Sequence, residues 1–185
     1  MRKNFGAKPY LYPQPVLIIA AYDETGTPNA MNAAWGGISE SNQITMCLSS
    51  SHRTVENILD TREFTVSVGT VSTVASCDYV GIVSGNNEPN KMPKSGFTTT
   101  KSEFVNAPII NELPLTLECK LISYNLESNQ MVGEIVNVSA DESILTDDKI
   151  NPEKLGAICY DPVNHYYLKV GEKVGDAFED GEKLK

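Results

Sequence analysis

The stretch Asn29-Ala30-Met31-Asn32-Ala33-Ala34-Trp35-Gly36 consists of small side chains around one large aromatic residue. A second stretch, Ser49-Ser50-Ser51-His52-Arg53-Thr54-Val55-Glu56-Asn57-Ile58, supplies hydroxyl groups and two potentially cationic side chains immediately before an apolar helical pattern. We interpret the first stretch as a strand whose small side chains let a flat ligand lie against the backbone. We interpret the second stretch as the start of a helix that contributes to the same ligand site.

The start of a helix is a natural binding place for a phosphate group. Its first N–H groups have no intrahelical acceptor and carry a partial positive charge. A flat ring with a phosphate is the outline of flavin mononucleotide (FMN), so the two stretches together predict an FMN site. Simpler interpretations stay open, because Trp35 also fits a core aromatic residue and both Ser51 and Thr54 fit ordinary helix caps.

Composition limits the classes of partner that the chain can have. Fifteen basic and 24 acidic residues give a formal net charge of −9, which disfavours attraction to nucleic acid or to an anionic membrane. No apolar run approaches the roughly 20 residues of a membrane span, and Met1–Gly6 lacks the apolar stretch of a signal peptide. We therefore expect a cytoplasmic protein that binds neither nucleic acid nor membrane and holds an anionic ligand by a local cluster of donors.

Motifs for several other chemistries are missing from the sequence. The four cysteines form no CxxC pair, and the two histidines have no Cys, Asp or Glu at metal-ligand spacing, so we expect no metal site. Nothing resembles a Ser/His/Asp arrangement, and no catalytic side chain can be named. No GxGxxG or GxxxxGK motif occurs, so NAD(P)H, if it is used, must dock transiently.

Strand patterns dominate the chain and predict a mainly β fold, either a barrel or a sandwich. The predicted strands cover residues 15–22, 29–35, 43–49, 63–68, 115–124, 131–140, 157–160 and 166–170. Two short helices are predicted, Thr54–Arg62 and Ser72–Val83, with Ser72 as the N-cap of the second. Gly85–Lys91 is predicted to be a loop. We expect a single domain over residues 1–185, with residues 171–185 as an exposed C-terminal arm or a strap onto a partner.

Short motifs follow one another in a characteristic order along most of the chain. They include Tyr12-Pro13, Asn29-Ala30-Met31, Trp35, Ser51-His52-Arg53-Thr54, Asp78-Tyr79-Val80-Gly81, Val83-Ser84-Gly85, Asn90-Lys91, Ser95-Gly96-Phe97-Thr98, Val132-Gly133-Glu134-Ile135, Tyr166-Tyr167 and Gly171-Glu172. In number and order these motifs resemble the flavin reductase-like family of FMN-binding split barrels, particularly its flavoredoxin-like branch. The resemblance implies a six-stranded antiparallel Greek-key split barrel with a few short helices, a homodimer, and FMN near the subunit interface.

The resemblance also implies positions for the cofactor-binding residues. It places Asn32, Ala33, Ala34 and Trp35 beside the isoalloxazine and ribityl portions, and Ser49, Ser51, His52, Arg53, Thr54 and Lys91 around the phosphate. Many relatives carry Arg where His52 stands, and a neutral histidine donates only one hydrogen bond. Lys91 and Arg53 are expected to compensate, although a solvated surface position is the simpler interpretation of each.

Three functions remain open from the sequence. The first is an oxidoreductase in which FMN takes hydride from NAD(P)H, or electrons from a redox protein, and passes them to flavin or another acceptor. The second is a non-enzymatic electron carrier, and the third is a binding module whose barrel serves oligomerisation. Tyr166 and Tyr167 alternate across a strand, so at most one of them is expected to face the flavin. His165 is expected to be a surface residue.

Overall fold

Strand β2 (Leu17–Tyr22) is the centre of the fold because it is buried on both of its faces. In the computed structural model, which describes residues 1–185, Leu17 and Ile19 face one hydrophobic cluster while Ile18 and Ala20 face another. Side chains alternate across a strand, so a strand between two cores must be apolar at every position. The continuous apolar run in the sequence therefore reflects burial on two sides.

The main sheet curls into a split barrel whose neighbouring strands are all antiparallel. Its order is β3 (Pro28–Ala33), β2, β6 (Glu63–Val68), β9 (Leu115–Asn125), β10 (Gln130–Ala140), β5 (Gln43–Cys47) and β4 (Gly36–Glu40). The first and last strands of this order, β3 and β4, are separated along the chain only by Ala34 and Trp35. Counted as one bent strand they give six barrel strands, as the family resemblance implies.

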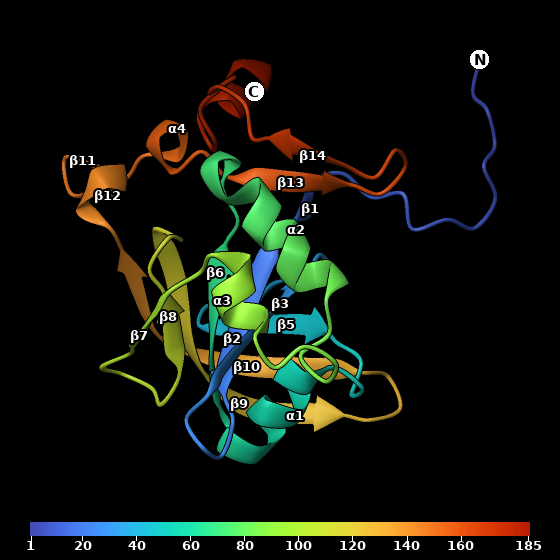
Figure 1. Ribbon diagram of the computed structural model, residues 1–185. Helices are drawn as coiled ribbons and strands as arrows, with labels where there is room; N and C mark the ends of the chain where they lie inside the picture. Colours follow the sequence, from blue (N-terminus) through green and yellow to red (C-terminus); the bar gives the residue numbers. More distant parts are fainter.

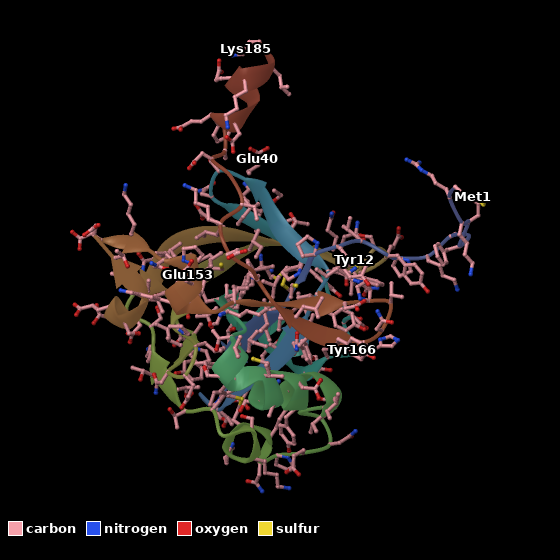
Figure 2. All side chains as sticks on the ribbon, turned by 90° about the horizontal axis from the view of Figure 1, so that it is seen from above. Met1, Tyr12, Glu40, Glu153, Tyr166 and Lys185 are labelled. Carbon is pink, nitrogen blue, oxygen red and sulfur yellow. The ribbon has the colours of Figure 1, made fainter.

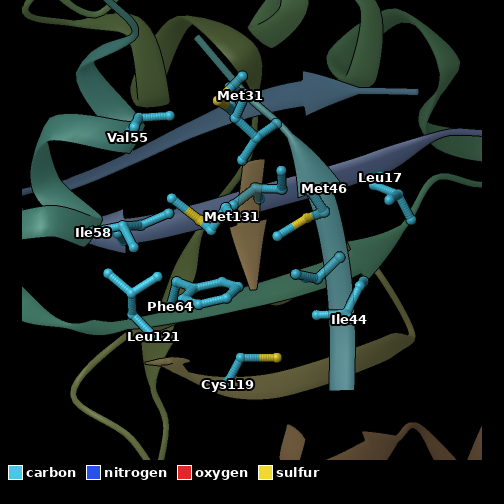
Figure 3. Close-up of a cluster of buried hydrophobic side chains, with 14 residues drawn as sticks. Leu17, Met31, Ile44, Met46, Val55, Ile58, Phe64, Cys119, Leu121 and Met131 are labelled. Carbon is cyan, nitrogen blue, oxygen red and sulfur yellow. The ribbon is translucent and has the colours of Figure 1, made fainter. Parts of the chain in front are cut away.

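The barrel interior is filled by a cluster of 14 buried apolar side chains, shown in Figure 3. The Phe64 ring lies inside it with no exposed surface. Gly133 on β10 faces this ring so closely that a Cβ at residue 133 would lie 2.4 Å from Phe64 Cζ. Helix α1 (Arg53–Thr61) closes one end of the barrel and adds Val55 and Ile58 to the same cluster.

A second layer covers the outer face of β2 and β3. Helices α2 (Val74–Ile82) and α3 (Lys91–Ser95) lie in front of these strands in Figure 1. Cys77 and Val80 of α2 and Met92 of α3 pack with the outward side chains of β2 in a cluster of 11 buried residues. This layer brings the end of α2 and the start of α3 close to the start of α1.

Smaller elements extend the ends of the barrel. They are the three-stranded sheet β1 (Gln14–Pro15), β13 (Ile158–Asp161) and β14 (Tyr166–Lys169), the pairs β7 (Thr99–Lys101) with β8 (Pro108–Ile110) and β11 (Leu145–Thr146) with β12 (Lys149–Ile150), helix α4 (Pro152–Leu155), and the 3-10 turns Val71–Thr73, Glu142–Ile144 and Asp180–Leu184. The two chain ends, marked by Met1 and Lys185 in Figure 2, both extend away from the barrel. No helix is both long and apolar enough to cross a membrane.

The sequence interpretation was wrong at three boundaries near the outer layer. Strand β3 ends at Ala33, so Trp35 lies in the link to β4, which was not predicted. Ser72 is not the N-cap of a helix, because residues 71–73 form a 3-10 turn and Thr70 forms a capping box with Thr73 before α2 begins. Lys91 was assigned to a loop, but it is the first residue of α3.

Candidate functional site

A polar cavity lies where the start of α1 meets β3, the end of α2 and the start of α3. It has a volume of about 270 Å³, and we call it the cradle cavity. It is lined by Asn29, Met31, Asn32, Ser51, His52, Arg53, Thr54, residues 80–85 and Lys91. Segments far apart in the sequence therefore converge on one place, and most of the side chains that they bring there are hydrogen-bonding groups.

The start of α1 presents free donors to the cradle cavity. His52 is the N-cap with an extended backbone, and no side chain caps the helix. The N–H groups of Arg53 and Thr54 have no intrahelical acceptor, because they belong to the first turn. Thr54 Oγ1 accepts a 2.7 Å hydrogen bond from Asn29 Nδ2, which leaves its own O–H free to donate.

Lys91 is a buried cation with no anionic partner. Its side chain is only 4% exposed, and no carboxylate of the protein lies within ion-pair distance of its ammonium group. Burial lowers the pKa of Lys91 from 10.5 to about 8, because desolvation disfavours the charged form. A buried charge normally requires a counter-charge, so an anion bound in the cradle cavity would relieve this penalty.

Two glycines allow α2 and its following loop to approach β3. A Cβ at residue 81 would lie 3.0 Å from Asn32 Cβ, and one at residue 85 would lie 2.5 Å from Asn29 Oδ1. The loop after Gly85 is held over the start of α1, because Asn86 Nδ2 donates a 3.2 Å hydrogen bond to Ser51 O. The glycines therefore make the cradle cavity narrow at the place where donors converge.

A second cavity continues from the first along β3 toward the hairpin of β13 and β14. This hairpin cavity has a volume of about 420 Å³ and is lined by Asn32, Ala33, Ala34, Asp78, Gly81, Ile82, Tyr160, His165 and Tyr167. It shares three of these residues with the cradle cavity: Asn32, Gly81 and Ile82. The two cavities therefore adjoin at these shared residues, beside the small side chains of β3, as the two ends of one elongated ligand would require.

A hydrogen-bond network fixes the polar wall of the hairpin cavity. Tyr167 donates a 2.9 Å hydrogen bond from its hydroxyl to Asp78 Oδ1. Burial, followed by this bond, raises the pKa of Tyr167. Asn32 Nδ2 donates to Cys77 O at 3.0 Å, which leaves Asn32 Oδ1 as an acceptor for a ligand N–H.

The two tyrosines of β14 lie in different surroundings. Tyr167 lines the hairpin cavity, whereas Tyr166 is 60% exposed. His165 is exposed as expected, but its Nδ1 lies 2.6 Å from the Tyr160 hydroxyl at the cavity edge. The sequence assigned no site role to Asp78, because it meets Tyr167 only through the contact between α2 and the hairpin, which no local pattern marks.

Trp35 lies outside both cavities. Its side chain is 57% exposed and lines a third, more apolar cavity of about 530 Å³ together with Ala34 and Pro15. Ala34 lines this third cavity and the hairpin cavity. Trp35 therefore follows a residue of the hairpin cavity in the sequence, but its own side chain lines a separate cavity.

Six of the ten predicted binding residues meet in the cradle cavity: Asn32, Ser51, His52, Arg53, Thr54 and Lys91. Ala33 and Ala34 line the hairpin cavity. Ser49 lines neither cavity, although its hydroxyl lies 2.9 Å from that of Ser51. The Arg53 side chain is 41% exposed and forms long ion pairs with Asp23 and Glu56 at 3.6 and 3.5 Å, so part of its charge is already engaged.

The donor set and the cavity walls fit FMN. A phosphate would meet the free helix start, the Thr54 hydroxyl and the unpartnered Lys91 in one place, which is the arrangement that helix starts offer to phosphates. In the adjoining hairpin cavity, the small residues Ala33, Ala34 and Gly81 leave room for a flat ring against the backbone. Asn32 and Tyr167 supply polar groups to that wall.

The sequence and fold are similar to those of known flavoproteins. The flavoredoxin of Desulfovibrio vulgaris (Miyazaki F) is 37% identical, with 98% of this chain and 100% of that chain covered and a TM-score of 0.93. Flavoredoxin from Methanosarcina acetivorans is 26% identical with 100% of each chain covered and a TM-score of 0.90. An FMN-binding domain of a flavin reductase-like enzyme from Shewanella baltica OS155 shares the fold, with 20% identity, coverage of 88% of this chain and 89% of that one, and a TM-score of 0.79.

The family model of the flavin reductase-like domain matches residues 10–155. That range contains the barrel strands, the three helices around the cradle cavity and every residue of that cavity. The β13–β14 hairpin, which completes the hairpin cavity, lies beyond it. The chain belongs to the flavin reductase-like family.

Proposed function

We propose that the protein is an FMN-binding oxidoreductase that holds the phosphate in the cradle cavity and the ring system along the hairpin cavity. It accepts hydride from NAD(P)H, or electrons from a redox protein, and passes them to flavin or another acceptor. The observation that carries the proposal is Lys91, which is 4% exposed and has no anionic partner beside an uncapped helix start. The structural neighbour from Shewanella baltica OS155, an FMN-binding domain, supports FMN as the flavin.

The residues of the site would bind and orient the cofactor in separate ways. Lys91 supplies charge to the phosphate, and Thr54 with the first N–H groups of α1 supplies directed hydrogen bonds. Asn32 offers an acceptor oxygen in the hairpin cavity because its amide nitrogen is occupied by Cys77 O. Tyr167 keeps its proton because burial and the hydrogen bond to Asp78 raise its pKa. The tyrosine in the wall of the hairpin cavity therefore stays neutral.

When bound, FMN supplies the reversible uptake of hydride or electrons that no side chain of the site provides. The protein therefore needs to bind, orient and shield rather than to contribute a nucleophile. The sequence contains no dinucleotide-binding motif for a nicotinamide donor, so NAD(P)H would dock transiently at the open side of the hairpin cavity. The four cysteines are all free thiols, which fits the reducing cytoplasm that we propose as its location.

A non-enzymatic electron carrier is the second candidate function. The likeness to two flavoredoxins over nearly the whole chain favours it. Two exposed aromatic side chains flank residues of the hairpin cavity along the chain: Tyr166, 60% exposed, precedes Tyr167, and Trp35, 57% exposed, follows Ala34. Exposed aromatic side chains suit a transient protein partner. An electron carrier would bind FMN as tightly as an enzyme would, but it would react slowly with NAD(P)H.

We also propose that the working unit is a homodimer. The N-terminal segment leaves Phe5 62% and Leu11 68% exposed, and the C-terminal tail leaves Val174 97% and Phe178 98% exposed. Extended segments with apolar side chains and no packing of their own suit contacts with a second subunit. Figure 2 shows that both ends leave the barrel body, so they are free to reach a neighbour.

The proposal is tested by titrating FMN and riboflavin into Lys91→Met. Loss of a charge-assisted hydrogen bond should weaken FMN binding by about 1 to 3 kcal/mol, while riboflavin, which lacks the phosphate, should bind as before. Lys101→Met is the control, because Lys101 is exposed on β7 and lines neither the cradle cavity nor the hairpin cavity. Flavin fluorescence quenching measures the affinities of the wild type and both variants for each ligand.

Equal affinities of the wild type for FMN and riboflavin would contradict the phosphate site. Parallel weakening of both ligands in Lys91→Met would mean that Lys91 supports the fold and not the phosphate. Anaerobic addition of NADH or NADPH to the FMN complex then separates the two candidate functions. Rapid bleaching of the flavin absorption supports the enzyme, and bleaching only with a reduced redox protein supports the carrier.

A further inference from the structure

Tyr160 and His165 form a hydrogen-bonded pair at the edge of the hairpin cavity. His165 Nδ1 lies 2.6 Å from the Tyr160 hydroxyl, and both side chains line the cavity. His165 is exposed to water, whereas Tyr160 is half-buried. The pair therefore joins the cavity to the surrounding water through a single hydrogen bond.

The turn between β13 and β14 holds His165 in a conformation that is unusual for its residue type. Its φ is 59°, in the left-handed region that glycine adopts more easily. The buried Asp161 fixes the turn, since its Oδ1 accepts hydrogen bonds from the backbone N–H groups of Val163 at 2.8 Å and Asn164 at 3.1 Å, and its backbone oxygen accepts a 3.0 Å bond from the His165 N–H. A histidine where glycine would be less strained indicates a role for the imidazole.

The other titratable groups around the pair are already engaged. Asp78 and Tyr167 share the wall of the hairpin cavity, and burial, followed by the hydrogen bond to Asp78, raises the pKa of Tyr167. Below the turn, the hydrogen bond from the Tyr12 hydroxyl lowers the pKa of Asp161, so that it stays an anion. Among the groups that line the cavity, His165 alone is of a type that exchanges a proton between about pH 5 and 8.

The two routes by which a bound flavin can be reduced differ in their need for a proton. Hydride from NAD(P)H delivers two electrons together with one proton, so reduction to the anionic form of the flavin needs no other proton. Two electrons from a redox protein bring no proton, and the same product then requires one from the protein or from water. A side-chain pair that passes a proton into the cavity therefore matters for the second route only.

We infer that Tyr160 and His165 form a proton relay that serves electron transfer from a redox protein. The Tyr160 O–H bond breaks as its proton passes to the flavin ring, where an N–H bond forms, and the Nδ1 proton of the charged imidazole replaces it on the tyrosine oxygen. The neutral imidazole then takes one proton from water, so two electrons and one proton are transferred in all. The inference rests on the proposed function, because the ring system must lie in the hairpin cavity.

The first test compares Tyr160→Phe with the control Tyr166→Phe, which removes a hydroxyl from an exposed ring outside the cavity. Each FMN-loaded protein is reduced anaerobically by reduced methyl viologen, which supplies electrons alone, or by N-benzyl dihydronicotinamide, which supplies hydride. The ratio of the viologen rate to the hydride rate should fall by about a hundredfold in Tyr160→Phe, the lower end of what a positioned acid or base contributes. A change in the position of the flavin would alter both rates and leave their ratio nearly constant.

The second test uses His165→Gly, which removes the imidazole from a backbone conformation that glycine adopts without strain. Thermal unfolding should therefore show this variant to be at least as stable as the wild type. Its rate ratio should fall as in Tyr160→Phe, and imidazole added to the buffer should restore the ratio because the position is exposed. In the wild type the ratio should decrease as pH rises from about 5 to 8, as histidine loses its charge.

The midpoint potential of bound FMN gives a readout that does not depend on any rate. A charged His165 stabilises the anionic reduced flavin, so the wild type should have the higher potential at about pH 5 and the same potential as His165→Gly at about pH 8. A potential difference that is constant with pH, or equal slowing of both routes in Tyr160→Phe, would overturn the relay. Normal FMN binding with unchanged rate ratios would overturn it and leave the proposed function intact, whereas a wild type that fails to bind FMN would end both.

Discussion

The barrel interior and the cleft on its outer side, which consists of the cradle cavity and the hairpin cavity, are built on the same strands but satisfy their buried groups in different ways. Inside, 14 apolar side chains pack against one another, and Phe64 and Met131 have no exposed surface. In the cleft, Lys91 is almost as deeply buried, yet its ammonium group has no ion-pair partner. On the adjoining helix α1, the buried amide nitrogen of Asn57 also has no hydrogen-bond partner. The interior is complete without a ligand, and the cleft is not.

This difference separates the residues that stabilise the fold from those that serve a ligand. Packing of apolar surface stabilises the folded chain, whereas an unpaired buried donor destabilises it. A mutation inside the barrel should therefore lower stability without changing ligand preference. A mutation of an unpaired donor in the cleft should change ligand preference with little loss of stability.

The largest effect is expected for Phe64→Ala in the barrel interior. Removing a fully buried ring that contacts Gly133 leaves a cavity and should lower the free energy of unfolding by about 3 to 5 kcal/mol. Denaturant unfolding measures this loss, with the exposed Tyr166→Ala as a control expected to stay within about 1 kcal/mol. The ratio of FMN to riboflavin affinity should not change in either variant. A shifted ratio in Phe64→Ala would show that the interior and the cleft are coupled.

A smaller effect is expected from the titration of Lys91. Its folded pKa of about 8 lies below the unfolded value of 10.5, so the unfolded chain binds more protons between these pH values. The ligand-free protein should therefore become more stable as pH rises from about 8 to 10.5, by at most about 1.4 kcal/mol per pH unit. Below about pH 8 the penalty is present in full and constant.

Subtracting the curve of Lys91→Met from that of the wild type isolates this contribution, because other titrating groups cancel. Bound phosphate should keep the ammonium charged, so FMN affinity should fall as pH rises above about 8. A difference curve that is flat across this range would show that the Lys91 ammonium is already stabilised by the ligand-free protein. That result would remove the contrast between the complete interior and the incomplete cleft.

The sequence predicted the strands of the barrel well because they carry strong periodic signals, whereas the choice of a split barrel over a sandwich came from the family resemblance. The two-sided burial of β2 appears as the run Leu17–Ala21, and the long strands β9 and β10 alternate clearly. The short strands β7 and β11 were missed, since two or three residues carry no periodicity. The extra strand β4 was missed because Gly36–Glu40 is mostly exposed and has no apolar face.

The site was predicted where its residues are contiguous and missed where the fold assembles it. Residues 51–54 form one local motif, so the helix start was found. Asp78 and Tyr167 meet only because the β13–β14 hairpin packs near α2, and no spacing along the chain encodes that contact. Lys91 was found by the resemblance, but the sequence assigned it to a loop and so did not predict its burial at the start of α3.

The smallest effect on stability is expected from deleting residues 172–185. The tail's ion pairs, such as Lys173–Asp176 and Lys183–Asp180, join residues within the tail, so nothing of this kind ties it to the barrel. The free energy of unfolding of the monomer should change by less than about 0.5 kcal/mol. Its exposed apolar side chains, Val174 and Phe178, should instead matter for contact with a second subunit.

Sedimentation of the full chain and the truncated chain, each with and without FMN, measures this contribution. If the tail crosses to a partner, truncation should weaken the dimer and lower FMN retention together, because both depend on the same contact. Unfolding at low protein concentration, where the dimer is dissociated, should remain nearly unchanged. A full-length monomer that holds one FMN per chain would show that the cleft is completed by the ligand alone, since the barrel then supplies every group that the cofactor needs.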